Sequence, residues 1–433
     1  MSGLLLRGGM LIPMTSREAI GLGDILIQDG RIAAIYPGGA PEEVRSSVSE
    51  IRNVAGQLVL PGLVNAHTHA AMTLFRSFAD DLPLMRWLKE AIWPAEEKLT
   101  GDDVYWGTKL AIAEMLKSGI TTFADMYFFM DQVAQASLDT GIRAHLSRGM
   151  VGFGPSAEKA LTESAAFFRQ YNGAGDGLTR VWLGPHAPYT CSPDYLKRVM
   201  ALADELGTGL HIHLSETATE VDDMTKQYGL PPVELMDSIG LFERPVLAAH
   251  CVHLNEKERA ILVEKGVGIA HNPVSNMKLA SGVAPVEALR QAQAILALGT
   301  DGAASNNNLD LIEEMRQAAL LQKVHLLDPL ALPAYEALEM ATIGGARALR
   351  WDDEIGTLEV GKRADLITIN LQQPHLCPDH DPVSRLVYAA KGADVATVLV
   401  NGRILVDQGR LTCMDEEEVM AKATAAAYRL TRQ

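Results

Sequence analysis

The sequence lacks the marks of a secreted, disulfide-bonded or membrane protein. Its four cysteines are Cys191, Cys251, Cys377 and Cys413. They lie far apart and form no CxxC pair, which argues against a disulfide framework and against a thiolate metal site. No uncharged apolar run reaches the ~18 residues of a membrane span. The first residues, MSGLLLRGGMLIPM, hold too short an apolar stretch for a signal peptide. We therefore expect a cytoplasmic protein that does not bind membranes.

Basic residues are also scarce. The chain has 38 Lys and Arg against 54 Asp and Glu, so its formal net charge is −16. Nucleic-acid polymers and anionic membranes require basic surface, and this balance argues against both as the main partner. The 433 residues are 48% hydrophobic and 21% charged, which allows a large buried core. This length suits a barrel of about 250–300 residues with a smaller second domain.

The two ends of the chain carry the same pattern. Each has two short β-rich runs joined by a turn dipeptide: residues 24–28 and 31–35 around Asp29-Gly30, and residues 397–400 and 403–406 around Asn401-Gly402. Asp-Gly and Asn-Gly predict hairpins because both turn residues need a positive φ. A further strand is expected over 365–370. We therefore predict that residues 1–57 and 362–433 form one composite β-sandwich domain.

Residues 58–361 alternate between apolar runs and helical stretches. The expected strands are Leu58–His69, Ile120–Met126, Ile142–Gly149, Val181–Ala187, Leu210–Glu216, Val246–Cys251, Val267–His271 and Ala294–Asp301. Ser192-Pro193 starts one expected helix, which Gly207 ends, and another is expected over 102–118. Eight apolar strands separated by helices predict a closed (β/α)₈ barrel.

Most of the expected strands end in a side chain that binds metals or moves protons. These are His67, His69, Asp125, Arg148, His186, His213, Glu216, His250, His271 and Asp301. Loops that begin with ordinary polar residues would favour Gly, Asn, Ser and Asp, whereas this set is rich in imidazole. Barrel active sites lie at the C-terminal ends of the strands, so we expect the site there.

The pattern His67-Thr68-His69 predicts a metal site. Alternate residues of a strand face the same way, so both imidazoles point to one side. With His213 and Asp301 they make three nitrogens and one carboxylate, a set that suits Zn²⁺ or Fe²⁺ rather than Mg²⁺ or Ca²⁺. The expected fourth strand contains no lysine to bridge two ions, so a single metal ion is the simpler interpretation.

Two further strand-end residues have open roles. Glu216 follows His213 by three residues, where it is either a general acid/base or a glutamate favoured at a helix N-terminus. His250 is either a fourth nitrogen ligand or a polar group that does not bind the ion. Spacing alone leaves both questions open.

Four motifs together resemble a known family. They are PGLVNAHTH at 61–69, HCVHL at 250–254, HNPVSNMKL at 271–279 and GTDGAASNN at 299–307. The first resembles the metal-binding opening of the amidohydrolase superfamily. Together they are similar to the 5′-methylthioadenosine/S-adenosylhomocysteine deaminases over nearly the whole chain. That resemblance implies a cytoplasmic hydrolase that acts on a small-molecule purine nucleoside. The oligomeric state is left open, and a homo-oligomer is one expectation.

The resemblance also implies roles at the metal and the reacting ring. His67, His69, His213 and Asp301 bind one ion, usually zinc, with Fe²⁺ or Mn²⁺ as alternatives. Glu216 moves protons at the purine ring. His250 polarises the nucleophile without ligating the metal, and Asp301 helps to orient it. Glu216 and Asp301 therefore also contact the substrate.

Three more positions are implied to bind the substrate. His186 contacts it directly, Glu96 accepts hydrogen bonds from both ribose hydroxyls, and Arg148 lies near the 5′-substituent. Some relatives have a second arginine shortly downstream, where this chain offers only Lys159. Four apolar residues either line a thioether pocket or simply pack: Met72, Trp87, Met126 and Phe153.

The expected activity is hydrolytic deamination of a purine nucleoside to an inosine-type product and ammonia. The substrates expected are 5′-methylthioadenosine, S-adenosylhomocysteine, adenosine or 5′-deoxyadenosine. The alternatives are a related hydrolase of another ring, such as an s-triazine chlorohydrolase or a guanine or pterin deaminase, and a non-catalytic scaffold of the same fold.

Overall fold

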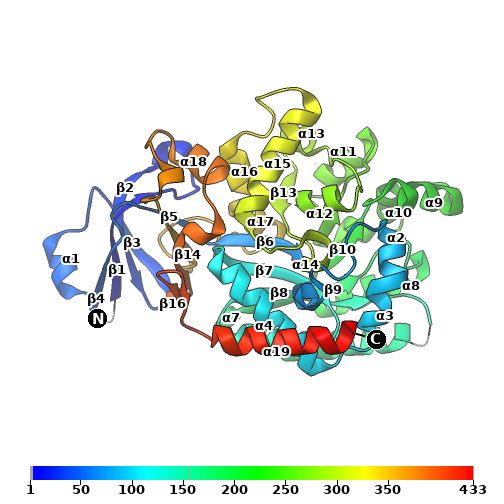
Figure 1. The fold of residues 1–433 in the computed structure, drawn as a ribbon. Helices are drawn as coiled ribbons and strands as arrows, with labels where there is room; N and C mark the ends of the chain where they lie inside the picture. Colours follow the sequence, from blue (N-terminus) through cyan, green and yellow to red (C-terminus); the bar gives the residue numbers. More distant parts are fainter. Residues whose placement is uncertain (1–2, 155, 433) are drawn as a thin grey trace.

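The computed structural model describes residues 3–154 and 156–432. Within them the chain forms one sheet of eight strands and one of nine. Figure 1 shows the nine-stranded sheet at one end of the molecule and the helix-covered barrel at the other. Among the described residues, no helix is both long and apolar enough to cross a bilayer.

The eight-stranded sheet is parallel and follows chain order. Its strands are β6 (Leu63–Thr68), β7 (Ile120–Tyr127), β8 (Arg143–Met150), β9 (Thr179–Pro185), β10 (Leu210–Leu214), β11 (Val246–His250), β12 (Gly268–His271) and β13 (Ile295–Leu298). Each of the eight predicted apolar runs overlaps one of them, with ends that differ by a few residues. The (β/α)₈ barrel is therefore confirmed.

The end of the last strand joins the end of the first through a few hydrogen bonds. Asp301 N donates to His67 O at 3.0 Å. The Asn65 side chain donates to Thr300 Oγ1 at 2.8 Å and accepts from Thr300 N at 3.0 Å. This closure brings the residues after β13 next to the histidines of β6.

The first predicted run, Leu58–His69, is divided between the two sheets at Pro61-Gly62. β5 (Gln57–Pro61) pairs with β1 (Gly3–Leu11) and β14 (Leu366–Asn370) in the nine-stranded sheet, and β6 begins the barrel. A Cβ on Gly62 would lie 2.0 Å from Thr121 Oγ1, so only glycine fits where the chain crosses. The expected boundary at residue 58 thus falls inside a strand of the terminal sheet.

The nine-stranded sheet is built from both ends of the chain. Besides β1, β5 and β14 it contains β2 (Gly21–Gln28), β3 (Arg31–Pro37), β4 (Glu50–Asn53), β15 (Val395–Val400), β16 (Arg403–Asp407) and β17 (Arg410–Leu411). Both predicted hairpins are present, with φ of 49° and 74° at Asp29-Gly30 and of 47° and 71° at Asn401-Gly402.

The two hairpin turns meet across the terminal sheet. Ala364 N donates to Gly30 O, and Gly402 N donates to Ala364 O. Apolar side chains from both arms, among them Ile27 and Leu399, share one buried cluster. The expected second domain from both termini is therefore present as one mixed sheet with a buried apolar cluster.

Helices connect the barrel strands and cover them. The longer ones are α4 (Gly101–Lys117), α5 (Met130–Thr140), α6 (Ser156–Tyr171), α8 (Pro193–Leu206), α9 (Ala218–Tyr228), α11 (Glu256–Glu264), α15 (Leu311–Leu326) and α16 (Ala334–Ala341). As predicted, Ser192 caps α8 through a bond from Tyr195 N, and Gly207 ends it with φ 63°. α4 starts at Gly101, one residue before the predicted position, behind the cap Thr100.

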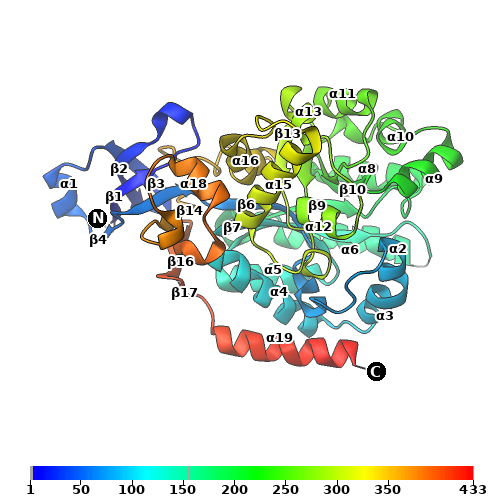
Figure 2. The same cartoon turned by 45° about the horizontal axis from the view of Figure 1, so that its top comes forward.

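The last helix, α19 (Glu416–Thr431), lies against the barrel rather than in the terminal sheet. Figure 2 shows it running along the outside of the molecule beside α4, far from the N-terminus. Arg429 pairs with Asp103 of α4, and Lys117 Nζ pairs with Glu416 at 2.6 Å. The expected division at residue 362 therefore assigns to the terminal domain a helix that packs on the barrel.

Candidate active site

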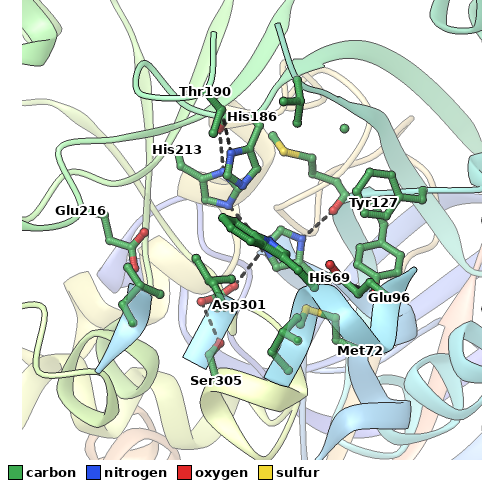
Figure 3. Close-up of a pocket in the computed structure, with 18 of the residues that line it drawn as sticks. His69, Met72, Glu96, Tyr127, His186, Thr190, His213, Glu216, Asp301 and Ser305 are labelled. Atoms are coloured by element: carbon green, nitrogen blue, oxygen red, sulfur yellow. Dashed lines mark hydrogen bonds and ion pairs between the residues drawn. The ribbon is translucent and has the colours of Figure 1, made fainter. Parts of the chain in front are cut away.

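The C-terminal ends of the barrel strands surround a cavity of about 590 Å³. Eight of the nine predicted site residues line it: His69, Glu96, Arg148, His186, His213, Glu216, His250 and Asp301. The ninth, His67, is fully buried, with Nε2 3.5 Å from Asp301 Oδ1. Figure 3 shows His69, His213 and Asp301 turned toward one another in this cavity.

Three imidazoles and one carboxylate converge on a common centre. His69 Nε2 lies 3.3 Å from His213 Nε2 and 3.3 Å from Asp301 Oδ1. The nitrogens of His67, His69 and His213 all lie within 4.8 Å of one another. His67, His250 and Asp301 form a second group within the same limit. The four residues predicted as metal ligands are thus brought together.

The other ring nitrogens of this cluster fix how the imidazoles face. His69 Nδ1 lies 2.6 Å from Met126 O, and His213 Nδ1 lies 2.8 Å from His186 O. A carbonyl only accepts, so each Nδ1 carries the proton and each Nε2 presents a lone pair. Two lone pairs that face each other at 3.3 Å repel unless a cation lies between them. The donor set therefore fits a divalent metal ion.

Burial and charge favour the ligating forms of these groups. Burial lowers the pKa of His67 to about 4 and the pKa of His213 well below its ordinary value, which keeps both imidazoles neutral. Burial opposes ionisation of Asp301, but the surrounding imidazoles hold the pKa of this carboxyl well below its usual range. Neutral nitrogens and an ionised carboxylate are what a metal site requires.

Hydroxyl groups that the sequence analysis left without a role hold Asp301 in place. Ser275 Oγ and Ser305 Oγ donate to Asp301 Oδ2 at 2.7 and 2.9 Å, and Gly302 N donates to Oδ1 at 2.8 Å. Ser275 lies on α12 (Pro273–Lys278) and Ser305 on α14 (Ala303–Asn306). Both belong to the family motifs, which was the one signal in the sequence that could have identified them.

The backbone is strained at the strand ends that carry these groups. Residues with positive φ are Ser215 (51°), His250 (74°), Cys251 (50°) and Asp301 (59°). Such conformations cost about 1–3 kcal/mol each in non-glycine residues and cluster at functional sites. Here they turn the side chains that follow β10, β11 and β13 into the cavity.

Glu216 lies just after β10, above the imidazole cluster. The carboxylate of Glu220 accepts hydrogen bonds from Ser215 N at 2.9 Å and Glu216 N at 2.8 Å, and this holds the turn. Burial raises the pKa of Glu216. A raised pKa makes it easier for a carboxyl to carry a proton that it can give, which fits the acid/base alternative.

His250 faces Glu216 from the end of β11. Its Nε2 lies 3.8 Å from Glu216 Oε2, and its Nδ1 lies 2.9 Å from Asn276 Oδ1. Burial opposes its protonation, but Glu216 and Asp301 raise the pKa of this imidazole. An imidazole of raised pKa between two carboxylates favours a hydrogen-bonding role over a fourth ligand.

Glu96, on α3 (Trp93–Glu96), accepts a hydrogen bond from a residue that the sequence analysis missed. Tyr127 Oη, at the end of β7, donates to Glu96 Oε1 at 2.7 Å. Desolvation raises the pKa of Glu96 to about 7, although this hydrogen bond opposes the shift. Figure 3 shows the pair on the side of the cavity away from Glu216.

Arg148 is held by an acidic partner behind the cavity wall. Its Nε and Nη2 donate to Glu163 Oε2 at 3.0 and 2.5 Å, and Nη1 donates to Gly149 O at 2.8 Å. Lys159 Nζ lies 3.2 Å from Glu163 Oε1 and is 74% exposed. Lys159 therefore pairs with Glu163, outside the residues that line the cavity.

His186 contributes a ring nitrogen to the cavity wall. Its Nδ1 lies 2.9 Å from Thr190 Oγ1, whose own proton goes to Ala187 O. The imidazole therefore donates from Nδ1 and keeps Nε2 as an acceptor. Burial lowers its pKa to about 4, so this neutral form persists near pH 7.

A parallel barrel with this cluster at its strand ends defines a metal-dependent hydrolase class. A family model described as the amidohydrolase family matches residues 58–405. The chain belongs to the amidohydrolase family.

Proteins of similar sequence support the family resemblance that the motifs indicated. A protein of Desulforudis audaxviator is 55% identical over 427 residues, which cover 99% of both chains. A protein of Pelotomaculum thermopropionicum is 53% identical over 435 residues, covering 100% of both chains. Both are called 5-methylthioadenosine/S-adenosylhomocysteine deaminase. The resemblance predicted from the sequence is confirmed.

Solved structures are similar over the same length. An adenosine deaminase from Xanthomonas campestris with bound zinc has a TM-score of 0.95 and 38% identity, covering 99% of this chain and 98% of that one. An atrazine chlorohydrolase from Arthrobacter aurescens TC1 complexed with zinc has a TM-score of 0.90 and 27% identity, covering 98% and 100%.

Proposed function

We propose that this chain is a divalent-metal-dependent deaminase of adenine nucleosides, with 5′-methylthioadenosine and S-adenosylhomocysteine as its main substrates. Full-length relatives at 53–55% identity support this activity. The observation that carries the proposal is one cavity that joins the imidazole cluster, the acid/base candidate Glu216 and the distant carboxylate Glu96. A nucleoside would place its purine ring at the imidazole cluster and Glu216, and its ribose diol at Glu96.

In this proposal His67, His69, His213 and Asp301 hold one ion, with zinc preferred over Fe²⁺ or Mn²⁺. The zinc in the similar adenosine deaminase structure supports that preference. When bound, such an ion lowers the pKa of water toward about 7 and so supplies a nucleophile at neutral pH. The remaining chemistry belongs to side chains of this protein.

Glu216 moves the protons of the reaction. It takes one proton from the attacking water and gives it to N1 of adenine as the water oxygen bonds to C6, and this forms a tetrahedral carbon. It then takes the remaining proton of the attacking oxygen and passes it to the amino group. The C6–N bond breaks, ammonia leaves, and the ring becomes that of an inosine-type nucleoside. Both steps require a carboxyl that gives and takes a proton readily, and burial, which raises the pKa of Glu216, favours this.

His250 and Asp301 orient the attacking water toward C6. The bond from His250 Nδ1 to Asn276 leaves Nε2 directed at the space near Glu216. Asp301 is fixed by Ser275 and Ser305 on one oxygen, so its other oxygen keeps one direction. Two fixed groups of this kind hold the water in its reacting orientation, so less rotational entropy is lost when the reaction occurs.

The rest of the cavity suits the sugar and its 5′-substituent. Glu96 accepts from both ribose hydroxyls, and His186 contacts the substrate through Nε2. Met72, Trp87, Met126 and Phe153 all line the cavity, so the open alternative of a thioether pocket is supported. Arg148 lies near the 5′-substituent, but Glu163 and Gly149 O already accept from Nε, Nη1 and Nη2, and the Glu163 carboxylate offsets the charge that a substrate carboxylate would meet. This favours methylthioadenosine over S-adenosylhomocysteine.

Glu96 separates this function from its nearest alternatives. Triazine, guanine and pterin rings carry no ribose diol, so a carboxylate at this position would have no partner on them. A non-catalytic scaffold would have no reason to keep the four converging donors together with Glu216 in one cavity. The nucleoside deaminase is therefore preferred over both alternatives.

Ammonia release tests the proposal directly. The zinc-loaded protein is assayed with methylthioadenosine, S-adenosylhomocysteine, adenosine, 5′-deoxyadenosine, guanine and a chlorotriazine. We expect the highest kcat/KM with methylthioadenosine and little turnover of the last two. His213→Ala should lose zinc and activity together, whereas His375→Ala, which breaks a pair with Asp394 outside the cavity, should keep both. Higher turnover of guanine or of the chlorotriazine would overturn the proposal.

A further inference from the structure

One histidine next to the cluster has no role in the proposed reaction. His211 lies on β10, two residues before His213, so both side chains face the barrel interior. It is fully buried, and its Nε2 lies 2.9 Å from His67 Nδ1. The two rings are nearly perpendicular, with centroids 5.0 Å apart and an interplanar angle of 81°.

This contact differs from those of the other two histidine ligands. His69 and His213 each bond through Nδ1 to a backbone carbonyl, which can only accept. The partner of His67 is an imidazole nitrogen, which either donates or accepts. His67 therefore depends on the tautomer of its partner, whereas His69 and His213 do not.

Only one arrangement of protons lets His67 bind a metal. Its Nε2 faces the cluster and has no hydrogen-bond partner among the described residues. For Nε2 to present a lone pair, Nδ1 must carry the proton and His211 Nε2 must accept it. The opposite tautomer would place a hydrogen on His67 Nε2, directed at Asp301 Oδ1 3.5 Å away, and would block ligation.

We infer that His211 is a positioning residue that holds His67 in its metal-binding tautomer. The inference rests on the ligand set of the proposed function. Partners of ligating histidines fix ring orientation and raise ligand basicity, and their loss costs about 10–100-fold in metal affinity. His211 would act in this way from one layer deeper in the barrel.

The test measures zinc affinity of the full-length protein by competition with a chelator, with metal content as the readout. His211→Leu removes the acceptor and should weaken zinc binding by about 10–100-fold. His211→Gln places an amide oxygen near the position of Nε2 and should restore most of that loss. If His211→Leu does not fold, His211→Asn, one methylene too short to reach His67, takes its place.

His145 supplies the matched control. It is a fully buried histidine on β8, inside the same barrel, and neither ring nitrogen has a hydrogen-bond partner among the described residues. His145→Leu should keep the wild-type zinc affinity, and thermal unfolding of the metal-free proteins reports any general loss of stability.

The outcomes separate the two proposals. Wild-type affinity in His211→Leu, equal losses in His211→Leu and His211→Gln, or an equal loss in His145→Leu would each overturn the role of His211. Failure of the unaltered protein to take up zinc would instead overturn the proposed function.

Discussion

Glu216 is the residue on which the proposed proton transfers depend. Glu216→Gln keeps the size of the side chain and its place above the cluster but removes the titrating proton. We expect the variant to bind zinc as the unaltered protein does and to lose about 10²–10⁴-fold in kcat, the usual effect of a general acid/base group. Steady-state kinetics with methylthioadenosine and metal analysis of the same sample measure both quantities. Full activity in a zinc-loaded Glu216→Gln protein would contradict this role.

The proposed ribose-binding role of Glu96 predicts that substrate binding depends on pH. Its pKa is raised to about 7, so in the free enzyme the carboxylate forms only as the pH rises through about 7. In the proposed complex the ribose hydroxyls donate to this carboxylate, so nucleosides should bind the ionised form better. The KM for methylthioadenosine should therefore rise below pH 7, by up to about tenfold per pH unit.

A comparison of variants isolates this effect from other groups that titrate. Glu96→Gln cannot ionise, so its KM should be higher at pH 8 and should change less between pH 8 and 6. Free adenine, which has no ribose, should show little difference between the two proteins. The KM values are measured in one buffer series at constant ionic strength. An unchanged slope of KM against pH in Glu96→Gln would rule out Glu96 as the source.

At the scale of elements, the strands were predictable because each is a short apolar run between helical stretches. Because active sites of such barrels lie at the C-terminal ends of the strands, the sequence alone also predicted that the residues at the ends of β6, β10 and β13 share one mouth of the barrel. Contacts between elements that are distant in sequence could not be predicted in this way. Tyr127 meets Glu96 only because α3 lies over the end of β7, and Glu163 reaches Arg148 only through the packing of α6.

The position of His211 was only partly predictable from the sequence. The spacing of His211 and His213 repeats that of His67 and His69, so alternation alone predicts that both pairs face the barrel interior. It does not give the distance across the barrel from β10 to β6, because that distance depends on how all eight strands close. The hydrogen bond between His67 and His211 therefore needed the structure.

The close approach of the last barrel strand to the first depends on a glycine two residues before Asp301. Gly299 follows β13, and a Cβ at this position would lie 2.3 Å from Asn272 Oδ1 and 2.9 Å from His67 N. Gly299→Ala must therefore push the segment before Asp301 away from β6. We expect a loss of about 1–3 kcal/mol in the free energy of unfolding, measured with urea, and weaker zinc binding.

Gly21→Ala is the control for this substitution. Gly21 begins β2, and nothing lies within 4 Å of the position of its Cβ. The same change in side-chain size there should leave zinc affinity as it is. If Gly299→Ala matched Gly21→Ala in both stability and zinc affinity, close approach of β13 to β6 would not be what holds the ligands together.

At the scale of the whole molecule, one buried ion pair joins the barrel to the terminal sheet. Arg143, on β8, donates from Nε to Asp365 Oδ2 at 2.8 Å and from Nη2 to Asn401 Oδ1 at 2.6 Å. The side chains of Arg143 and Asp365 are 0% and 1% exposed. Asp365 also accepts from Asn401 N at the second hairpin turn. The pair therefore links a barrel strand to both β14 and the hairpin.

Removing one partner of this pair should weaken the whole molecule. Asp365→Ala leaves the Arg143 guanidinium buried without its counter-charge, which typically costs about 3–5 kcal/mol. Lys117→Ala breaks a half-exposed pair with Glu416, where the side chains are 40% and 38% exposed, and should cost no more than about 1 kcal/mol. Urea unfolding followed by tryptophan fluorescence measures both variants. The backbone oxygen of Asp365 also accepts a hydrogen bond from Gly62 N just before β6, so displacement of the Asp365 segment would disturb the strand that carries His67. Asp365→Ala should therefore also release zinc at a lower urea concentration than Lys117→Ala, and equal midpoints for the two variants would contradict a linking role for this pair.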